Sequence, residues 1–400
     1  MSRQKKNIVI AGYGIEKIKK FLDAEKISAT VVHQKKLLGS GHAVNQAAGV
    51  LSGFDGSVLV VYCDTPLVSS GTLRKLLNDH RVHATDCTLL SVHFENPFSY
   101  GRICRRGDGS VEKIVEENDA TAAEKKLTEV NVGCYVFDSK KLFAALKCVR
   151  PATIARHQSI GGSVRDFWRT LAGRPNSVKK EIYLTDAVGI LTKTGRVRAV
   201  LSEDVAEAQG VNTRLDLSRI QCKMQQRLLD GWIEKGVQIR DPRTTTIDAD
   251  VKIGPGTTIL PNTVIEEGSR IGRDCTIGPF ARIRGASSVG DGSIIGNFVE
   301  LVRSKIGKKT QVKHLSYIGD AEVGHEVNIG AGTITANYDG KKKHKTIIRD
   351  KAQIGSGTVL VAPVTVGRGG RTGAGSVVAK GKNIPAGKTF VGVPAKELKK

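Results

Sequence analysis

The sequence predicts an α/β domain followed by a parallel β-helix built from six-residue repeats, and three observations support this. Over roughly the first 210 residues, strand-like and helix-like segments alternate. A single amphipathic helical stretch follows them. From residue 247 onward, an aliphatic residue returns at every sixth position, with small polar residues and glycine between.

The first part of the chain alternates short apolar runs with amphipathic segments. The pattern predicts helices over residues 16–23 and 42–51, and strands over residues 7–11, 29–33, 57–62, 87–92 and 134–137. Such alternation predicts a largely parallel sheet, whose ligands bind beyond the carboxyl ends of the strands. Asp64 directly follows the strand 57–62 and is expected at that edge. Considered alone, it is also a typical turn aspartate.

A helical stretch between residues 215 and 235 connects the two parts. Its apolar stripe at helical spacing consists of Leu217, Ile220, Met224, Leu228 and Trp232. Asp241 and Pro242 end it. The expected organisation is therefore an α/β domain over 1–213, a linker helix over 214–240 and a β-helix over 241–396.

The aliphatic residues of the second half follow a period that neither a helix nor a strand produces. The first are Ile247, Ile253, Ile259, Ile265, Ile271, Ile277 and Ile283. The count slips by one residue at Ile306 and is interrupted between Gly330 and Thr346. A chain that turns a corner every six residues has this period, and three sixes close one triangular coil, so about 150 residues form roughly eight coils. The interruption predicts a loop that leaves the coil, where function usually concentrates.

Composition narrows the class of protein. The 45 glycines and the 5% aromatic content suit a solenoid with tight turns and a narrow interior. Seven scattered cysteines without a CxxC pair argue against a disulfide framework or a zinc site and indicate a reducing compartment. No stretch is long and apolar enough to span a bilayer, so a cytoplasmic protein is expected.

The net charge of +23 has two interpretations: a soluble basic surface, or attraction of anionic small molecules such as nucleotides, sugar phosphates and coenzyme A. A nucleic-acid binder is not favoured, because the sequence has no recognition helix, zinc spacing or aromatic-basic strand motif. The densest basic cluster, residues 341–345, is expected to be a solvated loop with a role for one of its lysines.

Several motifs are specific to a known family. They are Leu-Gly-Ser-Gly-His-Ala at 38–43, Tyr-Cys-Asp at 62–64, Asn-Phe-Val-Glu at 297–300, His-Leu-Ser-Tyr at 314–317 and the run 328–340. In order, and over nearly the whole chain, they resemble the bifunctional N-acetylglucosamine-1-phosphate uridylyltransferase / glucosamine-1-phosphate N-acetyltransferase family. The resemblance implies a Rossmann-like nucleotidyltransferase domain and a left-handed β-helix acetyltransferase domain. The family's glycine-rich nucleotide loop and its lysine precede the segment that matches Asn7, so the first domain is expected to be incomplete.

For the first domain, the resemblance implies a site for UTP and N-acetylglucosamine-1-phosphate. Asp64 and Asn212 would hold Mg²⁺, a hard cation that prefers oxygen ligands. The residues implied to bind UDP-N-acetylglucosamine are Gln34, Gly39, Ser40, Gly101, Glu116, Asn131 and Asn212.

For the β-helix, the resemblance implies acetyl transfer from acetyl-CoA to glucosamine-1-phosphate. His314 matches the family's catalytic base. An imidazole suits this role because it titrates near neutral pH, although a lone histidine on a solenoid is usually structural or exposed. The implied sugar-phosphate residues are Arg284, Tyr317, Asn328 and Lys343, and the implied acetyl-CoA residues are Ala331, Asn337, Tyr338, Ser356 and Ala374. A third cationic position of the family is Val302 here, and the adjacent Arg303 is expected to face the other way.

Three hypotheses follow. The first is a bifunctional enzyme of UDP-N-acetylglucosamine synthesis, the second a single-function sugar-phosphate N-acetyltransferase, and the third a non-catalytic chain that assembles or regulates a related enzyme. The resemblance also implies a homotrimer, because hexapeptide solenoids of this family associate side by side. No nucleic-acid partner and no integral membrane association are expected.

Overall fold

A computed structural model describes residues 6–149 and 181–398. The chain divides into two compact units, Met1–Ile220 and Gln221–Lys400. Among the described residues, no helix is both long and apolar enough to cross a membrane.

The first unit begins with a small βαβ element. Strand β1 (Ile8–Ala11), helix α1 (Ile15–Ala24) and strand β2 (Thr30–His33) follow one another closely. The two strands pair in parallel, with Ile8 opposite Thr30, and form a two-stranded sheet of their own. The predicted strands and helix of this segment are therefore present.

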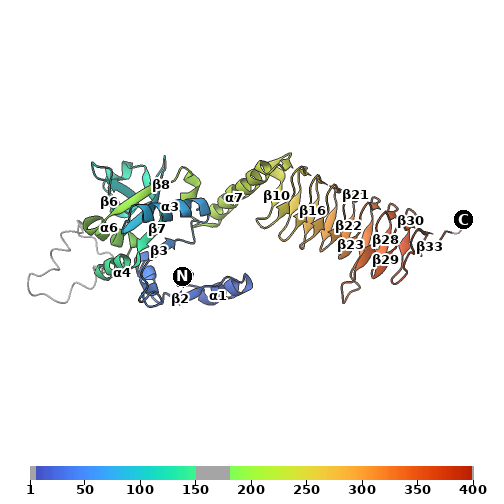
Figure 1. The fold of residues 1–400 in the computed structure, drawn as a ribbon, viewed down its shortest axis with the longest axis horizontal. Helices are drawn as coiled ribbons and strands as arrows, with labels where there is room; N and C mark the ends of the chain where they lie inside the picture. Colours follow the sequence, from blue (N-terminus) through green and yellow to red (C-terminus); the bar gives the residue numbers. More distant parts are fainter. Residues whose placement is uncertain (1–5, 150–180, 399–400) are drawn as a thin grey trace, which may run out of the picture. The chain divides into compact units, whose positions relative to one another are not determined.

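The larger sheet of the first unit has six strands (Figure 1). They are β3 (Ser57–Val61), β4 (Cys87–His93), β5 (Arg102–Arg105), β6 (Val111–Val115), β7 (Glu129–Asp138) and β8 (Val197–Leu201). The expectation of a largely parallel sheet was wrong here. Strand β7 runs antiparallel to β3, β4 and β5, and within the described sheet only β4 and β8 pair in parallel. The physical reason is the tight antiparallel pairing of β5 with β6, which reverses the chain before β7.

Helices cover this sheet. They are α2 (Ser40–Asn45), α3 (Ser70–Val82), α4 (Ser139–Cys148) and α6 (Leu184–Thr194), with short 3₁₀ turns at Gln46–Ala48, Glu117–Asp119, Glu124–Lys126 and Val205–Ala208. The helix expected over 42–51 is shorter than predicted, because a 3₁₀ turn replaces it after Asn45. Fully buried Leu89, Tyr135 and Phe137 belong to one core cluster together with residues of α4 and α6.

Helix α7 (Arg214–Glu234) covers the stretch 215–235 that was predicted to be helical, to within one residue at each end. It ends before Gly236, whose φ of 85° lies in the left-handed region that glycine adopts without strain. Near its end, Leu229 is buried in the same apolar cluster as Val237 and Ile247 of the first coil. A short 3₁₀ turn, Pro242–Thr244, leads into the repeats.

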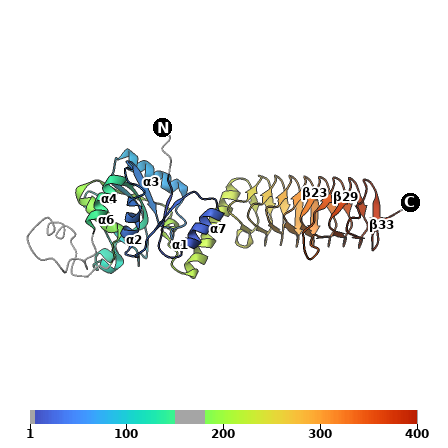
Figure 2. The same cartoon turned by 90° about the horizontal axis from the view of Figure 1, so that it is seen from below.

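The second unit is a parallel β-helix with three sheets as its faces, in which only the last described strand, β33 (Lys396–Glu397), pairs antiparallel. Figure 2 shows its coils stacked along one axis. The first face contains β10 (Thr246–Ile247), β13 (Val264–Ile265), β16 (Arg282–Arg284), β19 (Glu300–Val302), β22 (Tyr317–Gly319), β25 (Ile334–Ala336), β28 (Val359–Val361) and β31 (Val377–Val378). The second face contains β11 (Lys252–Ile253), β14 (Arg270–Ile271), β17 (Ser288–Val289), β20 (Lys305–Ile306), β23 (Ala321–Val323), β26 (Thr346–Ile348) and β29 (Val364–Val366). The third face contains β9 (Gln238–Ile239), β12 (Thr258–Ile259), β15 (Thr276–Ile277), β18 (Ile294–Asn297), β21 (Gln311–His314), β24 (Asn328–Ile329), β27 (Gln353–Ile354), β30 (Arg371–Thr372), β32 (Thr389–Val391) and β33 (Lys396–Glu397).

The aliphatic ladder predicted from the six-residue period lies inside this β-helix. Ile247, Ile265 and Ile283 pair in register on successive coils, and each is completely buried. The slip in the count is a coil of 17 residues, in which Val289 pairs with Ile306. The period therefore predicted both the burial and the register of this core.

The loop that leaves the coil is shorter than expected. The interruption was predicted over 330–346, but β25 within it stays in the first face, where Ile334 pairs with Val359. Only residues 337–345 leave the coil. The carboxylate of Asp339 holds them together by accepting hydrogen bonds from the backbone N–H groups of Lys341 and Lys342 and by pairing with His344.

Candidate active sites

The His314 imidazole lies at the end of β21, where the third face turns toward the first. One coil earlier, Asn297 ends β18 and pairs with His314 in register. The Asn297 Oδ1 lies 2.8 Å from His314 Nδ1. With the amide oxygen facing the ring, Nδ1 carries the proton and Nε2 keeps its lone pair. His314 is exposed, and Nε2 has no hydrogen-bond partner among the described residues, so this nitrogen is available as a base.

Three of the predicted acetyl-CoA residues stack on this same corner. The Gly357 N–H donates to the carbonyl of Ala331, and the Gly375 N–H donates to the carbonyl of Ser356, each at 2.7 Å. Ala374 directly precedes Gly375, so Ala331, Ser356 and Ala374 occupy equivalent places on successive coils. The 17-residue register between β21 and β24 places Ala331 one coil beyond His314. The structure thus arranges the predicted base and these residues in one column.

The first face carries two of the predicted sugar-phosphate residues. Arg284 ends β16, and Tyr317 begins β22, with β19 between them. The Arg284 Nε donates to Glu300 Oε1 at 2.7 Å, and this hydrogen bond raises the pKa of the guanidinium. Part of the positive charge at this position is therefore neutralised within the chain.

The family's third cationic position offers no charge here. Val302 is buried, with 1% of its surface exposed. The adjacent Arg303 has a left-handed backbone and donates two hydrogen bonds to Asp320, at 2.7 and 2.9 Å. Its guanidinium is therefore bound to a carboxylate and does not replace the cation that the family has at position 302.

The predicted residues Asn337, Tyr338 and Lys343 lie at the other end of the first face, where the loop 337–345 leaves the coil. Asn337 is buried and donates a hydrogen bond to Asp320, while Tyr338 is exposed and donates to the carbonyl of Gly340. Lys343 is exposed, and no ion pair involving it is found among the described residues. Within one chain, no described hydrogen bond joins His314 to Asn337 or Tyr338, because the two groups occupy different corners.

Asn328, the remaining predicted sugar-phosphate residue, lies on the third face. It begins β24, between Gln311 of β21 and Gln353 of β27. Its side chain is exposed. It is therefore placed beside the corner that carries His314 and Ala331.

In the first unit, the two predicted metal ligands lie side by side. The N–H of Val211, which precedes Asn212, donates to the backbone carbonyl of Asp64 at 2.7 Å. A side chain at Gly210 would approach both the Asp64 carbonyl oxygen, at 3.7 Å, and the Asn212 amide nitrogen, at 3.8 Å. Among the described residues, no group of three or more His, Cys, Asp or Glu side chains is placed to hold a metal. A cation held by Asp64 and Asn212 would therefore need phosphate or water oxygens as its other ligands.

The residues implied to hold the acetylated sugar also converge. The Asn131 N–H donates to the Gly101 carbonyl at 2.9 Å, and a side chain at Gly101 would lie 3.3 Å from Glu116 Oε2. Glu116 Oε1 accepts from Thr185 Oγ1 at 2.7 Å, and the Asn131 amide donates to the Tyr135 hydroxyl at 2.7 Å. Burial raises the pKa of that tyrosine well above its usual range.

The residues implied to read the uracil lie beside α2. Gln34 Nε2 reaches the Gly39 carbonyl at 3.1 Å and His42 Nδ1 at 3.0 Å, so its carbonyl oxygen is the group left for a ligand. Ser40 Oγ accepts from the Leu184 N–H at 3.0 Å. Gly39 has a φ of 100°, and a side chain there would lie 2.5 Å from the Ile182 carbonyl oxygen, so only glycine fits.

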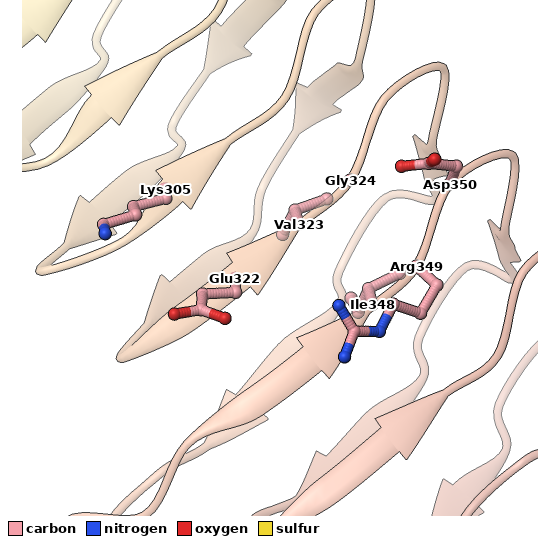
Figure 3. A pocket seen from close by; sticks show the side chains of 7 residues that line it. All are labelled: Lys305, Glu322, Val323, Gly324, Ile348, Arg349 and Asp350. Carbon is pink, nitrogen blue, oxygen red and sulfur yellow. The ribbon is translucent and has the colours of Figure 1, made fainter.

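Two hollows on the surface lie away from these residues. Figure 3 shows one of about 370 Å³ on the second face, lined by Lys305, Glu322, Arg349 and Asp350 among others. Glu322 there is paired with Lys345 at 2.7 Å. The other, of about 280 Å³, lies in the first unit beside Ser57 and His80, at the opposite end of β3 from Asp64. Neither contains a predicted site residue.

Sequence reasoning assigned no role to four residues that hold the predicted ones: Asn297, Glu300, Asp320 and Thr185. For the first three a signal existed, because each is separated from its partner by about one coil. Thr185 and Glu116 are 69 residues apart, and no local pattern connects them.

Comparison with known proteins identifies relatives of both units. Residues 4–167 match the family described as Nucleotidyl transferase, and residues 268–303 match the family described as Bacterial transferase hexapeptide (six repeats). The chain is 39% identical to the Bifunctional protein GlmU of Shouchella clausii over 407 residues, which cover 93% of this chain and 84% of the relative. It is 38% identical to that of Desulfitobacterium hafniense over 415 residues, 95% of this chain and 85% of the relative. It is 36% identical to that of Streptococcus pyogenes serotype M5 over 422 residues, 97% and 85%.

Proposed function

The chain belongs to the GlmU family of bifunctional proteins, and we propose that it catalyses two steps of UDP-N-acetylglucosamine synthesis. The β-helix transfers an acetyl group from acetyl-CoA to glucosamine-1-phosphate. The α/β unit transfers a uridylyl group from UTP to N-acetylglucosamine-1-phosphate. The observation that carries the proposal is the fixed imidazole of His314, whose free nitrogen lies in the column of Ala331, Ser356 and Ala374.

Acetyl transfer requires a neutral amine. The amine nitrogen of glucosamine-1-phosphate attacks the thioester carbonyl, and His314 Nε2 removes a proton from that nitrogen as it attacks. The C–N bond forms, the C–S bond breaks, and the imidazolium returns the proton to the departing thiolate. The role of Asn297 is to hold the ring so that Nε2, and not Nδ1, faces the amine.

The sugar phosphate is a dianion that needs positive charge. In this proposal Arg284 and Lys343 supply it, with Tyr317 and Asn328 as hydrogen-bonding partners. The ion pair of Arg284 with Glu300 aims the guanidinium and leaves two of its nitrogens for the phosphate. Lys343, exposed and without a described ion-pair partner, is free to approach the ligand.

For uridylyl transfer, a phosphate oxygen of N-acetylglucosamine-1-phosphate attacks the α-phosphorus of UTP and pyrophosphate leaves. Asp64 and Asn212 would hold Mg²⁺, which neutralises phosphate charge when bound. Gly101, Glu116 and Asn131 orient the sugar, and Gln34, Gly39 and Ser40 orient the uracil. The contact of Glu116 with Thr185 fixes one carboxylate oxygen and leaves the other for a sugar hydroxyl.

A homotrimer is part of the proposal. Phe280, Phe298 and Leu315 occupy one corner on three successive coils, are 49%, 55% and 60% exposed, and all have left-handed backbones. The rings of Phe280 and Phe298 stack with centroids 5.0 Å apart. An exposed apolar ridge of this kind is typical of an interface, and closed symmetry would cover it on every subunit. Self-association would also let one subunit's loop 337–345 approach another subunit's His314. Sedimentation as a monomer at micromolar concentration would contradict the trimer.

The test of the proposed function is a paired assay on the whole protein. Free thiol is measured with acetyl-CoA plus glucosamine-1-phosphate, and pyrophosphate with UTP plus N-acetylglucosamine-1-phosphate and Mg²⁺. We expect turnover in both. Thiol release without pyrophosphate release would restrict the function to N-acetyl transfer, and turnover in neither assay would overturn the proposal.

A further inference from the structure

Three side chains form a connected chain at the corner where the loop 337–345 leaves the β-helix. Arg303 Nε and Nη2 donate to the two oxygens of Asp320 at 2.7 and 2.9 Å. Asn337 Nδ2 donates to Oδ2 of the same carboxylate. Arg303, first of all, and Asn337 hold the pKa of Asp320 below its usual range, so the carboxylate is charged at neutral pH.

We infer that Asp320 and Arg303 are positioning residues for acetyl transfer that act through Asn337, an inference that rests on the function proposed above. An ionised carboxylate can only accept hydrogen bonds, so the Asn337 atom that faces Asp320 must be the amide nitrogen. This contact determines which way the amide is turned. It turns the carbonyl oxygen of Asn337 away from Asp320, so that this oxygen is left to accept a hydrogen bond from a substrate.

The surroundings of Asn337 make this orientation specific. Only 7% of Asn337 is exposed, so its amide has little room. Gly319 lies between the two predicted site residues, since a side chain there would meet the Tyr317 hydroxyl at 2.6 Å and Asn337 Nδ2 at 2.8 Å. The phenol and the amide therefore belong to one cluster, and reorienting the amide would disturb both.

Arg303 has a defined part in this arrangement. Its forked guanidinium binds both carboxylate oxygens, which fixes the plane of the Asp320 carboxylate. That plane sets the direction in which Oδ2 accepts from Asn337. Arg303 therefore does not bind phosphate itself, but acts on the substrate through Asp320 and Asn337.

A simpler interpretation is that the ion pair of Arg303 with Asp320 only stabilises the coil. The Arg303 side chain is 37% exposed and that of Asp320 is 18% exposed, and such pairs near the surface contribute little to stability. The two readings differ in what a substitution changes. A structural pair affects unfolding, whereas a positioning pair affects turnover and does so only when Asn337 is present.

The experiment compares three single variants and one double variant in the thiol-release assay. Asp320→Asn is chosen because the left-handed backbone at position 320 (φ 48°) tolerates asparagine. We expect kcat to fall about 10- to 100-fold in Asp320→Asn and about tenfold in Arg303→Gln, by analogy with the partners that orient metal-ligating side chains. Asn337→Ala should lower kcat at least as much as Asp320→Asn does. The double variant Asp320→Asn/Asn337→Ala should be no slower than Asn337→Ala alone.

Lys308→Gln is the matched control, because Lys308 forms a corner ion pair with Asp291 at 3.0 Å that involves no predicted site residue. It should leave kcat unchanged. Thermal unfolding and pyrophosphate release are measured for every variant, and both should stay near the values of the unmodified protein, which would exclude general loss of folding.

Each outcome decides the matter. An unmodified protein that releases no thiol overturns the acetyl-transfer half of the proposed function and this inference with it. If the unmodified protein is active, equal activity in Asp320→Asn overturns the inference alone. The inference is also overturned if the kcat of the double variant shows the product of the two single losses. It is overturned as well if the loss of turnover is matched by a loss of thermal stability.

Discussion

The two units assemble their candidate sites in different ways. In the β-helix, the partners that make up the site are about one coil apart in sequence, as for Asn297 with His314 and Arg303 with Asp320, 17 residues each. In the α/β unit, Glu116 meets Thr185 from 69 residues away, and Ser40 meets Leu184 from 144. One site is thus built from a repeated local step, and the other from contacts that only the complete domain brings together.

This difference predicts how far the effect of a single substitution extends within each unit. Each coil of a solenoid contacts its neighbours only, so a substitution there affects a few coils. The sheet of the α/β unit places β7 between β3 and β4, and removal of one contact is felt through the whole core. Four predictions test whether the two units are independent in this sense.

The largest expected effect is on chemistry. His314→Ala should lower kcat for thiol release by about 10²- to 10⁴-fold, because the proton of the amine loses its acceptor. Pyrophosphate release should be unchanged, since no residue of the α/β unit is altered. Steady-state kinetics with both substrate pairs provide the measurement. If kcat fell equally in both reactions, the two sites would be coupled and the predicted independence of the units would be wrong.

The reciprocal prediction concerns the cation. Chelation with EDTA, or Asp64→Ala, should reduce pyrophosphate release by at least about a hundredfold, because the phosphate charge is no longer neutralised. Thiol release should continue at its normal rate. Added Mg²⁺ should restore the chelated protein but not the variant. Thiol release that stops on chelation would place a cation requirement in the β-helix as well.

Stability should distinguish the units next. Ile295 in the solenoid ladder and Leu89 in the sheet are both completely buried, and either change to alanine should cost about 2–5 kcal/mol. Hydrogen exchange should show faster opening only in the coils next to residue 295, but across the whole sheet for Leu89→Ala. Faster exchange along the entire β-helix in Ile295→Ala would contradict nearest-neighbour coupling.

The smallest effect is electrostatic and belongs to the α/β unit. Lys113 pairs with Glu124 at 2.7 Å and is the main cause that lowers the pKa of Glu124 from 4.5 to about 2. A depressed carboxylate pKa stabilises the fold above pH 4.5, and the contribution is lost as the pH falls to 2. Lys113→Met should therefore lower the free energy of unfolding by less than about 1 kcal/mol at pH 7, because Lys113 is half-exposed.

Urea unfolding at pH 7, 4 and 3 measures this dependence. The difference between Lys113→Met and the unmodified protein should shrink as the pH falls. Lys140→Met, which removes an exposed pair with Asp55, is the control, and its effect should be smaller still. A difference that grows toward low pH would have the wrong sign and would contradict the assignment.

Prediction from sequence succeeded most in the repeats. The six-residue count anticipated the buried ladder and the coil of 17 residues at Ile306, because in a solenoid the period is itself the structure. It placed too many residues in the extruded loop, since Ile334 stays in the coil although the count is broken around it. In the α/β unit, the sequence predicted β1 to β4, part of β7, α1 and α2. It did not predict β5, β6, β8, α3, α4 or α6, nor the direction of β7.

The sequence by itself determined which aliphatic residues enter the core of the β-helix and which residues recur on one corner, because each coil depends only on its neighbours. Tertiary structure decided that β7 runs antiparallel and that Thr185 reaches Glu116. It also decided that Arg303 is bound to Asp320, and so which way the Asn337 amide faces. These facts depend on the partner that each polar group meets once the chain has closed around it, and spacing along the sequence does not specify that partner.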